Sequence, residues 1–129
     1  MTAQAPTIVL IEKDEVTLEI YQRELSKSFD VLAFTETTGV LDTIADQDIQ
    51  AVVIEPEICY GQGWALIHSI HENFPNRFIP VIVCTTLDTD NIDLAGEVTQ
   101  HLTKPVLPRT LREKTLEVLA GNAKRLRSR

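Results

Sequence analysis

The feature that most constrains this chain is the regular alternation of short apolar runs with stretches of helical periodicity. Thr7–Ile11 and residues 51–54 are apolar runs of the length and character expected of strands that are buried on both faces. The sequence predicts three further strands at residues 29–34, 78–84 and 98–103. Strands that alternate with helices pair in parallel through right-handed crossovers. We therefore expect an α/β fold with helices on both faces of one sheet.

The segments between the strands carry the apolar spacing of amphipathic helices. The expected helices run over residues 15–27, from a cap near Thr37 or Thr38, from Trp64 after Gly61 and Gly63, over 90–95 between Thr89 and Gly96, and from Pro108. Five strands of this kind favour a flavodoxin-like, doubly wound sheet of order 2-1-3-4-5. In such a sheet the functional site lies at the carboxyl ends of the strands.

Charge and composition narrow the classes of function. The chain has 129 residues and a formal net charge of −7, and 43% of its residues are hydrophobic, which suits one domain with a real core. Its last six residues carry four positive charges, so the rest is more acidic than the total. An acidic body argues against nucleic acid as a partner of the folded domain. We expect a disordered segment at 1–6, a domain at 7–120 and a basic tail at 121–129.

The hydropathy of the chain favours a cytoplasmic protein. No apolar run approaches the roughly 18 residues that a membrane span needs, so we expect no membrane partner. Residues 1–6 lack the basic start and apolar stretch of a secretory signal. Cys59 and Cys84 are far apart and in no metal-ligand spacing, so we expect small buried or half-buried thiols and no disulfide.

Charged and polar residues follow the predicted strands where the site of such a fold is expected. They are Glu12, Lys13 and Asp14 after the first strand, Glu55 and Pro56 after the third, Thr85 and Thr86 after the fourth, and Lys104 and Pro105 after the fifth. The carboxyl ends of parallel strands meet at one edge of the sheet. We therefore expect these side chains to gather there.

With these motifs in this order, the chain resembles the receiver domain of two-component response regulators, the CheY-like family, over nearly its whole length. Residues 8–15, 51–64, 80–85 and 101–105 carry the resemblance. It implies an acidic pair after the first strand, a phosphoacceptor Asp after the third, Ser or Thr after the fourth, and a Lys–Pro step with a cis bond after the fifth. It also implies a role in phosphorelay signalling.

Several positions depart from what the resemblance implies. Glu55 stands where the phosphoacceptor Asp is expected, and Lys13 stands where a second acidic residue binds Mg²⁺. Cys59 replaces a common Pro, Thr86 replaces a smaller residue, and His101 takes the place of an aromatic residue that acts as a switch. These departures predict a degenerate pseudo-receiver.

The charge of the predicted pocket argues against a metal. The formal charges of Glu12, Lys13, Glu55 and Lys104 cancel, whereas the resemblance implies a negative cluster that binds Mg²⁺. An ammonium among metal ligands repels a divalent cation. We therefore expect weak or absent Mg²⁺ binding and no other cofactor. Glu55 either reaches toward Lys104 and Thr85 in an active-like state, or is drawn to Lys13 in an inactive one.

Three functions remain open from the sequence. The first is a non-enzymatic module that binds a kinase, another regulator or a second copy of itself through the fourth helix, fifth strand and last helix. The second is a phosphorylatable regulator in which Asp14 is the acceptor. The third is a ligand-binding or enzymatic flavodoxin-like domain, although no glycine-rich phosphate loop or nucleophile grouping is present. His68 and His71 are expected to be surface residues without a role.

Overall fold

The computed structural model describes residues 5–86 and 96–127, and the side chains of residues 58–61 and 122–127 lie outside that description. Its centre is a five-stranded parallel sheet in the order β2-β1-β3-β4-β5. The strands are β1 (Thr7–Ile11), β2 (Asp30–Phe34), β3 (Ile49–Ile54), β4 (Val81–Thr85) and β5 (Gln100–Thr103). The predicted doubly wound, flavodoxin-like sheet is confirmed.

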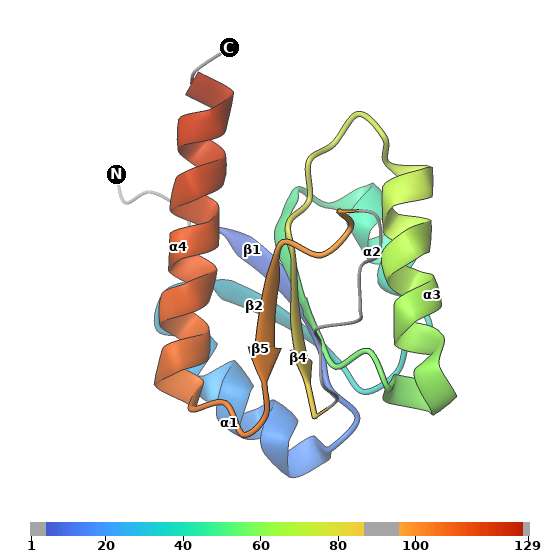
Figure 1. The fold of residues 1–129 in the computed structure, drawn as a ribbon, viewed down its shortest axis with the longest axis vertical. Coiled ribbons are helices and arrows are strands. Elements are labelled where there is room, and N and C mark those ends of the chain that lie inside the picture. Colours follow the sequence, from blue (N-terminus) through green and yellow to red (C-terminus); the bar gives the residue numbers. More distant parts are fainter. Residues whose placement is uncertain (1–4, 87–95, 128–129) are drawn as a thin grey trace.

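Four helices are present in the described residues, and they cover both faces of the sheet. They are α1 (Glu15–Leu25), α2 (Val40–Asp46), α3 (Ile58–Asn73) and α4 (Pro108–Arg127). The pairs α1 with α4 and α2 with α3 lie on opposite faces (Figure 1). The helix predicted over residues 90–95, with its cap Thr89, lies outside the described residues. None of the described helices combines the length and the apolar character needed to cross a membrane.

The core is split by the sheet into two layers because successive strand residues point to opposite faces. In β1, Val9 and Ile11 pack with α2 and α3, whereas Ile8 and Leu10 pack with α1 and α4. The same alternation in β3 and β4 explains why these strands are apolar throughout. Cys84 of β4 is a buried free thiol, as predicted, and the side chain of Cys59 lies outside the described residues.

The structure corrects several predicted boundaries. α3 begins at Ile58, so Gly61 and Gly63 lie inside the helix that they were expected to precede. α2 is preceded by Gly39 at φ 85°, and not by a capping threonine. β4 begins three residues later than predicted. The last helix continues to Arg127, so most of the predicted basic tail is helical in its backbone.

Fewer apolar residues of α1 are buried than their helical spacing in the sequence indicates. Asp14 caps the helix by accepting a hydrogen bond from the backbone N–H of Thr17 at 2.9 Å. Tyr21 and Leu25 are buried against the sheet. Val16 and Ile20, which the sequence counted with the apolar spacing of this helix, are 67% and 47% exposed. They lie on the side of α1 that faces away from the sheet.

Gly63 is required by a close contact between α3 and the loop after β3. A Cβ atom at this position would lie 2.6 Å from the Cα and carbonyl oxygen of Pro56. We predict that Gly63→Ala lowers the free energy of unfolding by about 1–3 kcal/mol, because backbone atoms must move to make room. Urea denaturation measures this change.

The matched control is Gly121→Ala in α4, where nothing lies within 4 Å of the added Cβ. Alanine is favoured over glycine in a helix by roughly 0.5–1 kcal/mol, so this variant should gain stability. Two substitutions with effects of the same sign and size would contradict the predicted contact.

Candidate functional site

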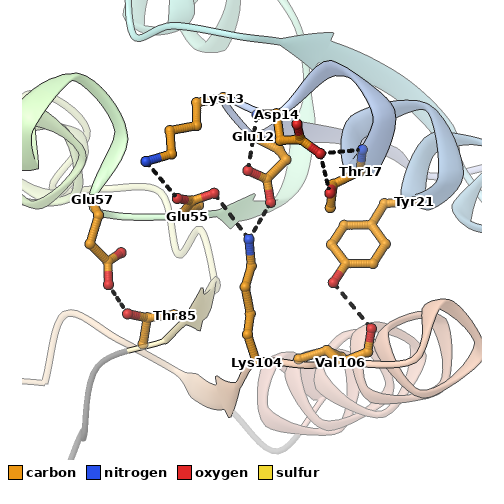
Figure 2. Close-up of polar contacts among 10 residues, drawn as sticks. All are labelled: Glu12, Lys13, Asp14, Thr17, Tyr21, Glu55, Glu57, Thr85, Lys104 and Val106. Atoms are coloured by element: carbon orange, nitrogen blue, oxygen red, sulfur yellow. Dashed lines mark hydrogen bonds and ion pairs between the residues drawn. The ribbon is translucent and has the colours of Figure 1, made fainter.

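The carboxyl ends of the strands bring Glu12, Lys13, Glu55 and Lys104 to one edge of the sheet. Backbone hydrogen bonds continue the strand ladders to three of these positions. The N–H of Glu12 donates to the carbonyl oxygen of Phe34, that of Glu55 to that of Ile11, and that of Lys104 to that of Thr85. The distances are 3.0, 3.0 and 2.8 Å. The sheet itself therefore fixes where these side chains begin, and Figure 2 shows them converging.

Lys104 lies at the centre of the cluster, between two buried carboxylates. Its Nζ atom is 2.5 Å from Oε1 of Glu12 and 3.0 Å from Oε2 of Glu55. Glu12 is 2% exposed and Glu55 is 9% exposed, so neither has water as its main partner. A buried carboxylate requires such a charge-assisted hydrogen bond. Lys104 therefore stabilises both carboxylates at once.

Lys13 pairs with the same glutamate from the solvent side. Its Nζ atom is 3.7 Å from Oε1 of Glu55, and its side chain is 59% exposed. Figure 2 shows Lys13 and Lys104 reaching Glu55 from different sides. The two orientations that the sequence left open for Glu55, toward Lys104 and toward Lys13, are present together.

Glu57 is a member of the site that was not among the residues predicted from the sequence. The hydroxyl of Thr85 donates a hydrogen bond to Oε1 of Glu57 (Figure 2). Burial raises the pKa of Glu57, and the charge of Glu55 adds to the effect. Its position two residues after Glu55 was the available signal, because a strand-end loop this short keeps both carboxylates near the same edge.

Burial and pairing set the protonation of the central groups. Burial, together with the neighbouring carboxyl of Glu55, raises the pKa of Glu12 to about 7. Burial opposes the charge on Glu55, but hydrogen bonds with Glu12 and Lys104 outweigh it and lower the pKa of Glu55. The pKa of Lys104 is raised, since its bonds with both glutamates outweigh its own burial. Lys104 is therefore an ammonium at neutral pH.

The carboxylate of Asp14, the alternative phosphoryl acceptor, caps the start of α1. Its Oδ2 atom accepts from the backbone N–H of Thr17 at 2.9 Å and from the Thr17 hydroxyl at 2.5 Å. These bonds lower the pKa of Asp14. In Figure 2 its carboxylate faces Thr17 and not Lys104. Asp14 contacts the cluster only through its backbone N–H, which donates to Oε2 of Glu12 at 3.3 Å, whereas its carboxylate caps α1.

The remaining predicted residues lie beside the cluster. Thr86 is exposed, and the Lys104–Pro105 peptide bond is cis. Thr86, Lys104 and Pro105 line a shallow hollow of about 390 Å³ together with Thr17, Tyr21 and Val106.

His101, the predicted switch residue, is half-buried on β5. Its Nε2 atom is shielded from solvent and has no hydrogen-bond partner among the described residues. Burial lowers the pKa of His101. The side chain therefore sits neutral at the edge strand, and its switch role stays a prediction.

The two histidines of α3 have partners that the sequence did not indicate. The ring of His68 lies 2.9 Å from Oε1 of Glu72 and 3.0 Å from Oε2 of Glu97. Its pKa is raised by the hydrogen bond with Glu97 and the charges of both glutamates. His71 Nε2 lies 2.8 Å from the backbone oxygen of Glu97. Both histidines therefore join α3 to the segment that precedes β5.

The cluster is poorly suited to a divalent metal. Within residues 5–86 and 96–127 no three His, Cys, Asp or Glu side chains are arranged to hold an ion. Oxygens of Glu12 and Glu55 that a metal would need already contact ammonium groups. Mg²⁺ prefers oxygen ligands in near-octahedral geometry, and two amines next to those oxygens oppose it. Weak or absent Mg²⁺ binding stays a prediction.

The parallel sheet of this order, with helices on both faces, matches the fold of CheY-like receiver domains of response regulators. A CheY-like receiver domain from Methanospirillum hungatei JF-1 superposes with a TM-score of 0.83 at 20% identity, over 95% of this chain and 99% of that chain. No protein-family model and no curated protein match the sequence.

Two further structures give the same result. A receiver domain from Clostridium thermocellum has a TM-score of 0.75 at 21% identity, with 94% of this chain and 98% of that chain covered. The chemotaxis response regulator CheY4 of Vibrio cholerae has a TM-score of 0.78 at 14% identity, with 89% and 99% covered. At such identities the likeness shows the fold, and the function rests on the residues of the site.

The two lysines should differ sharply in their contribution to stability. We predict that Lys104→Met lowers the free energy of unfolding by about 3 kcal/mol or more, because two buried carboxylates lose their partner. Lys13→Met should cost about 1 kcal/mol or less, since Lys13 is largely exposed. Urea denaturation at pH 7 compares them. Equal costs would show that Lys104 is not the central group.

Glu12 should make the stability of the domain depend on pH. Its pKa is about 7 when folded against 4.5 when unfolded, so the folded chain binds the proton more tightly. Its contribution is therefore complete below pH 4.5 and is lost as the pH rises through 7. Glu12→Gln should remove this component in a series of urea titrations. An unchanged pH profile in the variant would assign the dependence to other groups.

Proposed function

We propose that this chain is a receiver-like signalling module that acts by binding proteins, without catalysis and without phosphorylation of Glu55. The observation that carries the proposal is the double pairing of Glu55 with Lys104 and Lys13. Its fold is similar to that of a CheY-like response-regulator receiver domain, which supports a role in two-component signal transduction. The proposal places it in the cytoplasm, with no nucleic acid or membrane bound by the folded domain.

Glu55 is poorly placed to accept a phosphoryl group. Its carboxylate is one methylene farther from the backbone than that of Asp, which shifts the attacking oxygen away from the in-line position. Each of its oxygens faces an ammonium, at 3.7 Å for Oε1 and 3.0 Å for Oε2. Without a metal, transfer also loses the charge that stabilises its transition state. The pocket is therefore unsuited to phosphoryl transfer, which supports a module that acts by binding a protein.

The ion pairs give the pocket one fixed arrangement. Lys104 joins the ends of β1, β3 and β5, and the bond from Thr85 to Glu57 joins the end of β4 to the loop after β3. Four strand ends are thus connected by contacts internal to the chain. We propose that this arrangement holds in place the surface to which a protein partner binds.

The proposed partner surface includes β5 and α4. The helix predicted over residues 90–95, which the sequence assigns to the same surface, lies outside the described residues. β5 is an edge strand in which the first three side chains, His101 among them, are half-buried and Thr103 is exposed. A protein is the favoured partner because the folded body is acidic, which opposes nucleic acids and anionic lipids. A kinase or another regulator fits this chemistry.

Incubation with acetyl phosphate and Mg²⁺, followed by intact-mass measurement, tests the proposal. We predict no stable addition of a phosphoryl group to the natural chain. The double variant Lys13→Asp with Glu55→Asp restores an acidic pocket with a shorter acceptor, and it should gain both Mg²⁺ binding and the added mass.

A stable phosphoryl group on the natural chain would support the alternative, a phosphorylatable regulator. Asp14→Asn then identifies the acceptor: loss of the added mass would assign it to Asp14, and retention would assign it to another residue. Either result contradicts a phosphorylation-independent module. The capping bonds of Asp14 oppose its use as an acceptor.

A further inference from the structure

The ring of His68 lies between two carboxylates that belong to different parts of the chain. Its Nε2 atom is 2.9 Å from Oε1 of Glu72, one turn later on α3. Its Nδ1 atom is 3.0 Å from Oε2 of Glu97, which is 29 residues away in the segment that precedes β5. We call these two contacts the His68 bridge. The bridge connects α3 to the part of the chain that enters the edge strand of the sheet.

Both ring nitrogens of His68 face atoms that can only accept a hydrogen bond. A carboxylate has no proton to donate, so each nitrogen must carry an N–H to bind its partner. A neutral imidazole has one N–H, and only the imidazolium has two. The His68 bridge is therefore complete only when the ring is charged.

His71 makes a second contact between α3 and the same segment, and this contact does not depend on charge. Its Nε2 atom lies 2.8 Å from the backbone oxygen of Glu97. A carbonyl oxygen accepts a hydrogen bond from an N–H that the neutral ring and the cation can both supply. His71 thus holds the segment in either charge state, whereas His68 adds contacts that only the cation completes.

We propose that the His68 bridge is a pH-sensitive link between α3 and residues 96–99, formed while the ring is protonated and weakened once the ring is neutral. When the proton leaves, one ring nitrogen becomes an acceptor that faces a carboxylate oxygen, and the charge that attracts both glutamates is lost. Residues 96–99 lead directly into β5, so the bridge determines how firmly the start of the edge strand is held. The proposal goes beyond the proposed function and does not depend on it, because the bridge lies outside the Lys104 cluster.

The groups that face His68 set the direction of its titration. Among the described residues these are Glu72 on α3 and Glu97 before β5, and His71 shares the contact with Glu97. The hydrogen bond with Glu97 and the charges of both glutamates raise the pKa of His68 above its ordinary value of 6.5. Because the pKa is higher in the folded chain, the bridge is complete below pH 6.5 and is lost as the pH rises through the folded value.

The His68 bridge is expected to act locally. The side chain of His68 is 60% exposed, so water and salt screen its charge. Other contacts also hold the segment: Val98 packs against the apolar layer under α2 and α3, and the N–H of Thr99 donates to the backbone oxygen of Val81 at 2.8 Å. We therefore expect loss of the bridge to loosen residues 96–99 without unfolding the domain.

Titration of the histidine rings of the full chain by nuclear magnetic resonance tests the charge state. His68, assigned with the variant His68→Gln, should titrate above pH 6.5. Glu97→Gln should lower this midpoint more than Glu72→Gln does, because the hydrogen bond with Glu97 is the largest cause of the raised pKa. A midpoint at or below the ordinary value, or one that Glu97→Gln leaves unchanged, would overturn the proposal.

Hydrogen exchange tests whether the charge holds the segment in place. The N–H of Thr99 reports on residues 96–99. The N–H of Val52 in β3, which donates to the backbone oxygen of Pro80 at 2.9 Å, is the internal reference. Between pH 5.5 and pH 8.5 the protection of Thr99 relative to Val52 should fall about two- to fivefold, the effect of losing an exposed ion pair, and should stay constant in His68→Gln. A constant ratio in the natural chain, or an equal fall in the variant, would overturn the proposal.

Discussion

The buried pairing of Lys104 with Glu12 and Glu55 is the interaction on which the site depends. Two carboxylates at the ends of adjacent parallel strands repel one another and cannot stay charged in the interior without a cation. In a receiver-like pocket a divalent metal is expected to supply that cation, and here ammonium groups occupy its place. We propose that these contacts within the chain take the place of an exchangeable metal ion.

The architecture explains why so few residues decide this outcome. A doubly wound sheet brings strand ends to one edge regardless of their chemistry, so the fold supplies the meeting point and the side chains supply the function. Lys13, which follows β1, alone changes the formal charge of the cluster. Glu55, which follows β3, keeps the charge of an Asp and changes only how far the carboxylate reaches. The rest of the sheet is unaffected by the charges at its edge, because both of its faces pack in apolar clusters.

The sequence was most informative where periodicity and topology determine position. The apolar runs predict the strands, and the parallel topology predicts from the sequence alone that Glu12, Glu55 and Lys104 lie together. The sequence was least informative where the conformation of a loop determines the position of a residue. Glu57 joins Thr85 only because of how the loop after β3 turns, and Gly63 lies within α3 because the helix begins closer to β3 than its glycines indicate. Exposure of Val16 and Ile20 likewise depends on which stripe of α1 meets the sheet.

The most direct test of this account is a crystal of the natural chain soaked in Mn²⁺, with anomalous scattering used to locate the ion. Mn²⁺ takes the same oxygen ligands as Mg²⁺ and is visible at the site itself. We predict no anomalous peak at the strand ends, with Lys104 still contacting both glutamates. A peak coordinated by Glu12 and Glu55, with Lys13 turned into solvent, would contradict it.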